Sequence, residues 1–334
     1  MALREDLPRR QCHASLPGVG SVSRKSPSNV AASVQQRLLN KSRKEGEDYQ
    51  HILTRFALER YLYRLGLSRH KEKFILKGAM LFPLWGGELH RPTRDMDLHG
   101  SGESGVAHME EVFREICRVG GEDDGLKFLP ETVRGQGIRE DQEYDGVRIQ
   151  LECRLVASRI HLQIDVGFGD AVVPDPIETQ YPTLLEFSAP RIRVYPRELV
   201  VAEKYHALVV LGIANSRMKD YYDLSILARK FSFDGRMLCQ AIEATFKRRR
   251  TSVPAEVPMG LSGEFGDGPG KQTQWRAFLR KGRFADELLS LGEVISSLRE
   301  FLIPPSAAIS RKEMFELHWH PPGPWRKQAK SIVE

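Results

Sequence analysis

Hydrophobic and polar positions change their period along the chain, and each period predicts a different kind of element. Apolar residues recur at helical spacing in four segments before residue 212, which are 29–39, 49–67, 105–119 and 196–211. Short apolar or alternating runs predict strands at 74–76, 95–98, 126–133, 147–156, 160–168 and 192–195. Helical spacing returns in the last third, at 237–246, 275–284 and 288–302. Together the patterns predict a sheet covered by helices, followed by a helical half.

Changes in composition divide the chain into four parts. Residues 1–28 are rich in Pro, Ser, Gly and Arg and are predicted to form a flexible basic extension. Residues 29–195 are predicted to form one α/β domain, and residues 196–303 a helical domain with a basic face. Residues 304–334 are predicted to form a Pro-rich, flexible tail.

The overall composition is that of an ordinary globular protein. Of the 334 residues, 41% are hydrophobic and 28% are charged. The longest apolar run, 207–214, is too short to cross a bilayer, and charged residues near the N-terminus replace an apolar signal core. We therefore expect a cytoplasmic protein without membrane contact. The four cysteines are widely spaced, which argues against both a zinc site and a disulfide scaffold.

The charge balance favours a polyanionic partner. The net charge is +6 and the pI is near 9.1. Basic residues gather in three segments, which are 1–45, 247–250 and 271–283. Most charge runs are only solvated faces. Basic patches on both sides of an acidic centre are nevertheless what an enzyme acting on nucleic acid needs, because phosphate contacts supply affinity independent of sequence.

The strongest chemical signal lies around the turn at Gly78 and the strand that follows it. Side chains alternate between the two faces of a strand, so Asp95 and Asp97 point the same way while Met96 points the other way. Two converging carboxylates repel each other, and a divalent cation with oxygen ligands is the ordinary way to relieve that repulsion. Gly78 leaves backbone N–H groups free to meet an anionic group. The segment predicts a metal beside a phosphate.

A third acid, Asp165, lies on the polar face of a later strand whose other face is apolar. In one interpretation it joins the pair, either binding the metal or taking a proton from an attacking hydroxyl. In the other it only begins the glycine-rich turn that follows. The sequence leaves both open, and the Asp-rich loop 170–175 offers a further candidate ligand.

These motifs resemble those of the AbiEii-type nucleotidyltransferase toxins, which belong to the polymerase-beta-like nucleotidyltransferase superfamily. The resemblance rests first on Lys-Gly-Ala at 77–79 and on Arg-Pro-Thr-Arg-Asp-Met-Asp at 91–97, and it extends roughly over 47–230. It implies the α+β fold of that superfamily. The superfamily usually has Gly-Ser at the turn, whereas this chain has Ala79, so a hydroxyl contact to the triphosphate is missing and backbone amides would have to serve.

Two later segments extend the resemblance. Glu203-Lys204 on a predicted helix is similar to a lysine motif of the family, and Arg-Met-Lys-Asp-Tyr-Tyr-Asp-Leu at 217–224 is similar to its final motif. The resemblance implies that Asp220 belongs to the active site and pairs with a catalytic lysine, with Asp223 structural. From the residues alone, a lysine on a helix such as Lys204 is usually a surface residue, and Asp220 can be explained as an acid that favours the start of a helix.

The resemblance also implies roles for the basic residues and the turn. Lys77 and Lys204 would hold the phosphates of the nucleotide, Gly78 and Ala79 would form the turn beside it, and Arg94 and Arg217 would complete its binding site. Asp95, Asp97 and Asp165 would be the metal ligands. The expected cofactor is Mg²⁺ or Mn²⁺, with a nucleoside triphosphate as substrate.

The expected function is transfer of a nucleoside monophosphate to an acceptor hydroxyl, with tRNA as the expected acceptor. The resemblance implies the toxin of a bacterial toxin–antitoxin or phage-defence pair, with a separately encoded antitoxin protein. Two other functions stay open at this point. One is a small-molecule nucleotidyltransferase of the antibiotic-modifying kind, and the other is a nucleotide-binding module without catalysis.

Overall fold

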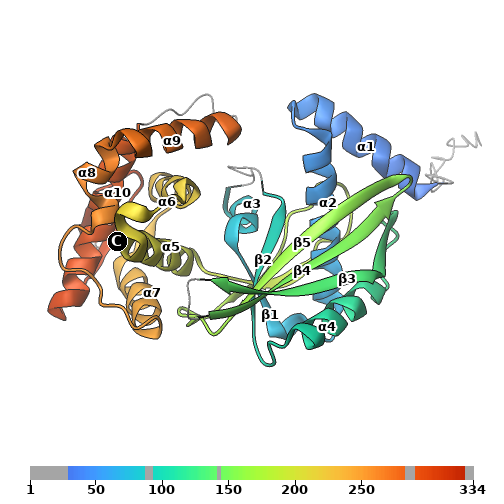
Figure 1. The fold of residues 1–334 in the computed structure, drawn as a ribbon, viewed down its shortest axis with the longest axis horizontal. Coiled ribbons are helices and arrows are strands. Elements are labelled where there is room, and N and C mark those ends of the chain that lie inside the picture. The colour runs from blue at the N-terminus through green and yellow to red at the C-terminus, as the bar shows by residue number, and fades with distance from the viewer. Residues whose placement is uncertain (1–28, 87–92, 141–143, 283–289, 328–334) are drawn as a thin grey trace, which may run out of the picture.

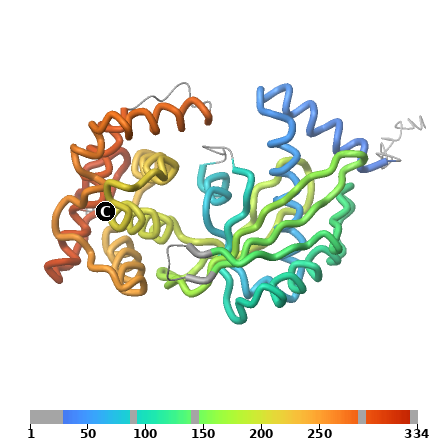
Figure 2. Tube along the Cα trace, in the orientation of Figure 1, coloured from blue at the N-terminus to red at the C-terminus, as the bar shows by residue number. Residues whose placement is uncertain are grey.

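The computed structural model describes residues 29–86, 93–140, 144–282 and 290–327. Figure 1 shows two lobes, a sheet lobe built from the first part of the chain and a helical lobe built from the rest. In Figure 2 the backbone passes from the first lobe to the second just before α5 (Arg197–Leu211). The predicted extension 1–28 and the last residues of the predicted tail lie outside the described residues.

A mixed seven-stranded sheet forms the centre of the sheet lobe, with the strand order β3-β4-β5-β2-β1-β7-β6. Its strands are β1 (Phe74–Lys77), β2 (Asp95–Gly100), β3 (Leu126–Glu140), β4 (Tyr144–Leu155), β5 (Ser158–Phe168), β6 (Ile177–Gln180) and β7 (Arg191–Val194). β2 runs parallel to β5, and β1 runs parallel to β7. The other neighbouring strands are antiparallel. The α+β fold class predicted from the sequence is confirmed.

Helices cover one face of this sheet. They are α1 (Val30–Glu45), α2 (Tyr49–Leu67) and α4 (Val106–Arg118), and a short α3 (Phe82–Gly86) precedes β2. α2 contacts β5 and β7, α4 contacts β3 and β4, and the rings of Tyr61 and Phe113 stack where the two helices meet. The fully buried Met96 and Leu98 of β2 belong to the same hydrophobic core. Their polar neighbours on β2 are therefore turned to the opposite face.

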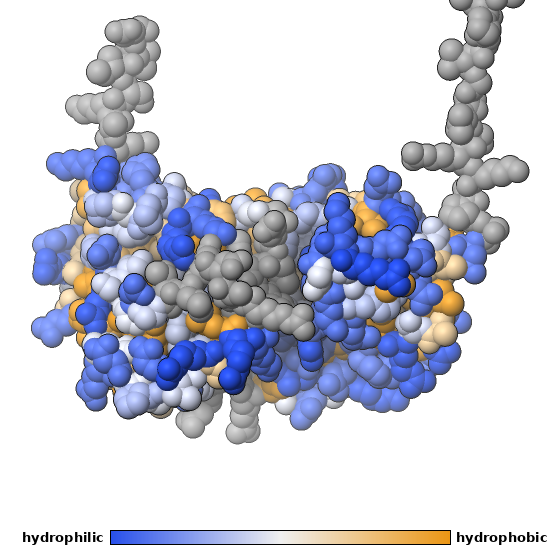
Figure 3. Space-filling model, turned by 90° about the horizontal axis from the view of Figure 1, so that it is seen from above, coloured by the Kyte–Doolittle hydropathy of each residue, from blue (hydrophilic) through white to orange (hydrophobic). Residues whose placement is uncertain are grey.

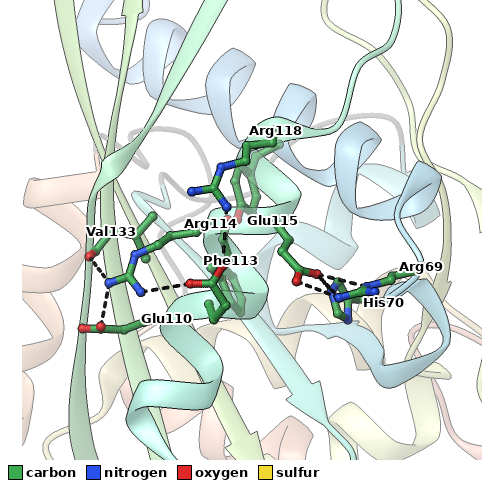
Figure 4. A network of polar contacts seen from close by, with 10 residues as sticks. Arg69, His70, Glu110, Phe113, Arg114, Glu115, Arg118 and Val133 are labelled. Carbon is green, nitrogen blue, oxygen red and sulfur yellow. Dashed lines mark hydrogen bonds and ion pairs between the residues drawn. The ribbon is translucent and has the colours of Figure 1, made fainter.

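The outer edge of the sheet at β3 is protected by side chains of α4. Glu110 accepts a hydrogen bond from the backbone N–H of Gly135 at 2.7 Å, and Arg114 donates to the carbonyl of Val133 at 3.4 Å (Figure 4). Glu115 of the same helix accepts from Arg69 at 2.6 Å and so ties α4 to the end of α2. Satisfied edge groups cannot pair with the strand of another molecule.

The helical lobe contains α5 and five further helices among the described residues. These are α6 (Met218–Lys230), α7 (Gly235–Arg248), α8 (Gly263–Asp267), α9 (Pro269–Gly282) and α10 (Leu291–Arg311). A small sheet, in the order β10-β9-β8, packs beside them and consists of β8 (Phe233–Asp234), β9 (Leu317–Trp319) and β10 (Trp325–Lys327). None of the helices in the described part of the chain is both long and apolar enough to span a membrane.

The flexible tail predicted for 304–334 is wrong for its described part. α10 continues through Pro304 and Pro305 to Arg311, and the chain then adds β9 and β10. Pro305 removes the N–H that would bond the carbonyl of Phe301, and the indole of Trp325 donates to that carbonyl instead, at 3.0 Å. The fully buried Trp319 donates to the carbonyl of Ala228 at 2.6 Å. Long-range contacts therefore replace the hydrogen bond that the proline removes.

Most other elements lie where the pattern places them. The helix predicted at 49–67 is confirmed with those bounds, as α2. β3 continues well beyond the predicted end at 133, and β6 was not predicted. Between the predicted helices 237–246 and 275–284 the structure adds α8 and the start of α9, which the pattern did not predict.

A buried carboxyl on α2 makes the stability of the fold depend on pH. Glu59 is 1% exposed and accepts a hydrogen bond from the N–H of Leu184 at 2.7 Å. Burial raises the pKa of Glu59 from 4.5 to about 7. Because the pKa in the folded state is the higher one, the stabilising contribution is present below pH 4.5 and is lost as the pH rises through 7.

We predict that Glu59→Gln, which keeps the acceptor but cannot ionise, makes the free energy of unfolding less dependent on pH. The decrease in the free energy of unfolding between pH 5 and pH 8, measured by urea denaturation, should be about 2 kcal/mol smaller in the variant than in the wild type. The exposed Glu313→Gln is the control and should behave like the wild type. An unchanged pH dependence in Glu59→Gln contradicts this account.

Candidate active site

Three carboxylates meet on the open face of the sheet. Asp95 and Asp97 lie on β2, and Asp165 lies directly opposite Asp97 on the parallel neighbour β5. One oxygen of each lies within 4.8 Å of one oxygen of each of the others. We call these three residues the aspartate triad. Among the described residues, no other group of three His, Cys, Asp or Glu side chains is placed to hold a metal ion.

The alternation of side chains along two strands creates this arrangement. On β2, Met96 and Leu98 are fully buried, and on β5 so are Ile164 and Val166. A one-residue slip of either strand would exchange these apolar side chains with the carboxylates. Burial of the apolar face therefore fixes the register that brings the aspartate triad together.

Gly78 makes the close approach to Asp97 possible. Lys77, the last residue of β1, pairs with Asp97 across the antiparallel ladder, and Gly78 follows with φ of +73°. A Cβ atom on Gly78 would lie 2.0 Å from Oδ2 of Asp97, which no side chain can occupy. Ala79 is buried in the turn and has no hydroxyl group. The turn thus presents backbone rather than side chain to the aspartate triad.

The electrostatics of the aspartate triad suit a divalent cation. Burial and the neighbouring Asp95 raise the pKa of Asp97 to about 6, against the opposing charges of Lys77 and Lys219. The hydroxyl of Thr93 donates to Asp95 at 2.7 Å. Clustered carboxylate oxygens are the ligands that Mg²⁺ and Mn²⁺ prefer, so the residues fit such an ion.

Asp165 has a second partner that the sequence did not reveal. Arg148 of β4 donates to both of its oxygens, at 2.8 and 2.7 Å. The guanidinium is about one third exposed and contributes a positive charge at the edge of the aspartate triad. Each oxygen of Asp165 keeps a further lone pair, so the carboxylate can hold Arg148 and still offer an oxygen to a metal ion. The alternation of apolar and polar residues along β4 was the one signal in the sequence that could have placed Arg148 on the polar face.

The helical lobe contributes a second group of charges. The ammonium of Lys204 on α5 lies 2.6 Å from Asp220 and 2.9 Å from Asp223, both on α6. Arg217 is the residue before α6, and the exposed Lys219 in its first turn lies near enough to Asp97 to favour its ionised form. The structure thus brings together the lysine and acid that the resemblance pairs. Lys219 was within the motif that sequence reasoning quoted but was not singled out.

Lys77 and Arg94, two further residues expected to bind the nucleotide, also have partners within the protein. Lys77 is 9% exposed, and its ammonium lies 3.2 Å from Asp170. Arg94 is exposed and donates to a ring nitrogen of His51 at 3.1 Å. Asp170 was left open as a metal ligand, but it is committed to Lys77 and lies outside the aspartate triad. Arg91 lies outside the described residues.

Comparison with known proteins identifies the family of this chain. The sequence profile of the family described as nucleotidyl transferase AbiEii toxin, type IV TA system, matches residues 60–302. The chain therefore belongs to the AbiEii family of nucleotidyltransferase toxins. Membership of a type IV toxin–antitoxin family implies a nucleoside triphosphate substrate and an antitoxin partner. No curated protein matches the chain.

Two crystal structures from Helicobacter pylori are similar to this chain. One, of a candidate nucleotidyltransferase, is 14% identical with a TM-score of 0.43, and the match covers 79% of this chain and 96% of that one. The other, of JHP933, is 13% identical with a TM-score of 0.43, and the match covers 79% of this chain and 94% of that one. Likenesses at this level carry no argument about the site.

The closeness of Gly78 to Asp97 gives a prediction with a matched control. We expect Gly78→Ala to lower the rate of nucleotide transfer at least about 100-fold, because the methyl group must displace the carboxylate from its position. Gly46→Ala carries the same kind of backbone strain, at φ of +66°, with nothing within 4 Å of the added methyl, and should keep its activity. Transfer of label from a nucleoside triphosphate measures both, and thermal unfolding checks that both variants fold. Equal activity of the two variants would contradict the role given to Gly78.

Proposed function

We propose that this protein transfers a nucleoside monophosphate from a nucleoside triphosphate to a hydroxyl group of tRNA, as the toxin of a toxin–antitoxin pair that acts in phage defence. The observation that carries the proposal is the aspartate triad, assembled from two parallel strands beside a glycine turn. Membership of the AbiEii family supports the reaction class.

The aspartate triad is the proposed site of Mg²⁺ or Mn²⁺. Asp95, Asp97 and Asp165 would each supply one carboxylate oxygen. Such a cation supplies positive charge that stabilises the charge developing on the phosphates as pyrophosphate departs. Gly78 keeps side chains away from Asp97, so the backbone of the turn can approach the phosphates.

The chain's own residues then have separate tasks in the displacement. The acceptor oxygen forms a bond to the α-phosphorus, the bond from that phosphorus to pyrophosphate breaks, and the acceptor proton passes to a carboxylate, for which we propose Asp165. Asp220 and Asp223 hold the ammonium of Lys204, which then steadies the phosphates. Arg217 and Lys219 add positive charge at the start of α6.

Basic side chains on the helical lobe support an RNA acceptor. Arg276, Arg280 and Lys281 are exposed on α9, and the chain has a net charge of +6. Figure 3 looks onto the face that carries α9 and α1, and hydrophilic residues cover most of what is described there on both lobes. Cations spread over such a face match the phosphates of a nucleic acid, whereas a small neutral acceptor gains little from them.

We predict that purified protein with Mg²⁺, total tRNA and an α-³²P-labelled nucleoside triphosphate attaches label to RNA. Asp95→Asn should abolish this transfer, lowering the rate by at least about a thousandfold, because it removes one charge from the ligand set. Asp175→Asn, an exposed aspartate in the loop after β5, is the control and should transfer normally. Transfer that survives Asp95→Asn would refute the proposed centre. Nucleotide binding without any transfer by the wild type would indicate a non-catalytic module.

Salt dependence should separate RNA from a small acceptor. With about five phosphate contacts, we expect the affinity for tRNA to fall by about a hundredfold between 50 and 200 mM salt. Replacing Arg276, Arg280 and Lys281 together by Ala should reduce the slope of log K against log salt by about 2. Lys127→Ala with Arg154→Ala, exposed cations on β3 and β4, should leave the slope unchanged. A flat salt response would favour a neutral small-molecule acceptor.

A further inference from the structure

Lys77 lies beside the glycine turn, where its charge favours the ionised form of Asp97, but its ammonium also contacts acids outside the aspartate triad. Its ammonium lies 3.2 Å from Asp170 and 3.7 Å from Glu203, and it lies 5.8 Å from the centre of the Tyr195 ring. The residue is 9% exposed. Two acids also hold the ammonium of Lys204, but both of those lie on α6, whereas the acids beside Lys77 come from different lobes.

Asp170 is the centre of these contacts. Besides Lys77, it accepts from the guanidinium of Arg249 at 2.9 Å. Arg248 donates to the carbonyl of Gly169. Although burial favours the neutral carboxyl, the two cations lower the pKa of Asp170 to about 2, so the residue is ionised throughout the physiological range.

Four ionisable residues from both lobes meet here, and burial raises the pKa of one of them, Glu203, to about 7. Lys77 ends β1, and Asp170 follows β5, so both belong to the sheet lobe. Glu203 lies on α5, and Arg249 follows α7, so both belong to the helical lobe. We call these four residues the inter-lobe cluster. They adjoin the proposed site on both sides, because Lys77 precedes Gly78 and Glu203 precedes Lys204.

We propose that the inter-lobe cluster fixes the orientation of the helical lobe, which carries Lys204, relative to the sheet lobe, which carries the aspartate triad, and that Lys77 is a positioning residue that does not bind phosphate. The proposal rests on the proposed nucleotidyl transfer for its kinetic consequences. Its structural content, that the cluster holds the two lobes in one orientation, is independent of that reaction. Buried charge pairs suit such a task, since each ion is favourable only in the geometry that pairs it.

Kinetics separate a positioning residue from a phosphate ligand. In Lys77→Met we expect kcat for nucleotide transfer to fall at least tenfold, with the KM for the nucleotide within twofold of wild type. Lys77→Arg keeps the charge and should restore most of kcat. Asp170→Asn cannot remove a phosphate contact, and it should reproduce the Lys77→Met effect. Lys73→Met, an exposed lysine just before β1, is the matched control for loss of a positive charge.

Spin labels test the orientation of the lobes without reference to activity. Gln36→Cys on α1 and Thr273→Cys on α9 are exposed positions on different lobes. Cys12 and Cys239 are first replaced by Ser, while Cys117 and Cys153 are buried. Pulsed electron-resonance distances between the labels should form one narrow distribution in the wild type and in Lys73→Met, and a broader one in Lys77→Met and in Asp170→Asn.

The kinetic and spin-label measurements test separate claims. If the wild type transfers no nucleotide, the proposed function is wrong. The distance distributions still test whether the inter-lobe cluster fixes the orientation of the lobes. A distribution that stays narrow in folded Lys77→Met or Asp170→Asn overturns the proposal. So does a tenfold rise in the nucleotide KM of Lys77→Met at unchanged kcat. If Lys77→Met does not fold, Asp170→Asn decides by the same criteria.

Discussion

The central constraint on this structure is the electrostatic repulsion among three carboxylates that lie close together. Burial, and then the like charge of Asp95, disfavour the ionised form of Asp97 and raise its pKa to about 6. The protein sustains this arrangement because burial of Met96 and Ile164 on the opposite face fixes the register of two parallel strands. Gly78 leaves space where any side chain would strike Asp97. The packing of the sheet core thus holds the three carboxylates together against their mutual repulsion.

The helical lobe supplies positive charge to this acidic centre. Lys204 is held by two acids of α6, Lys219 favours the ionised form of Asp97, and the inter-lobe cluster joins the lobes beside the same turn. A phosphate-bearing substrate needs such a balance, with cations to attract it and carboxylates to hold a metal ion. Family membership gives the reaction class, and the charges of the site suit it.

Local patterns predicted the fold and the shared face of Asp95 and Asp97, because both follow from side-chain periodicity. The helix 49–67 and the alternation around Asp95 and Asp97 needed no knowledge of distant partners, whereas the sequence left open whether Asp165 joins that pair or begins a turn. Prediction failed where a contact with a residue far away in the sequence determines the local structure. The tail after Ile303 is ordered by Trp325, which bonds the carbonyl that Pro305 leaves without its donor. Likewise, Asp170, 93 residues away, turns Lys77 inward.

The central claim is that the aspartate triad is a single divalent-metal site. Anomalous diffraction at the manganese edge, from crystals soaked in Mn²⁺ with a non-hydrolysable nucleoside triphosphate, tests it most directly. The account predicts one strong peak within coordinating distance of Asp95, Asp97 and Asp165, and no peak there in crystals of Asp97→Asn. A wild-type crystal with bound nucleotide and no manganese at these carboxylates would contradict it.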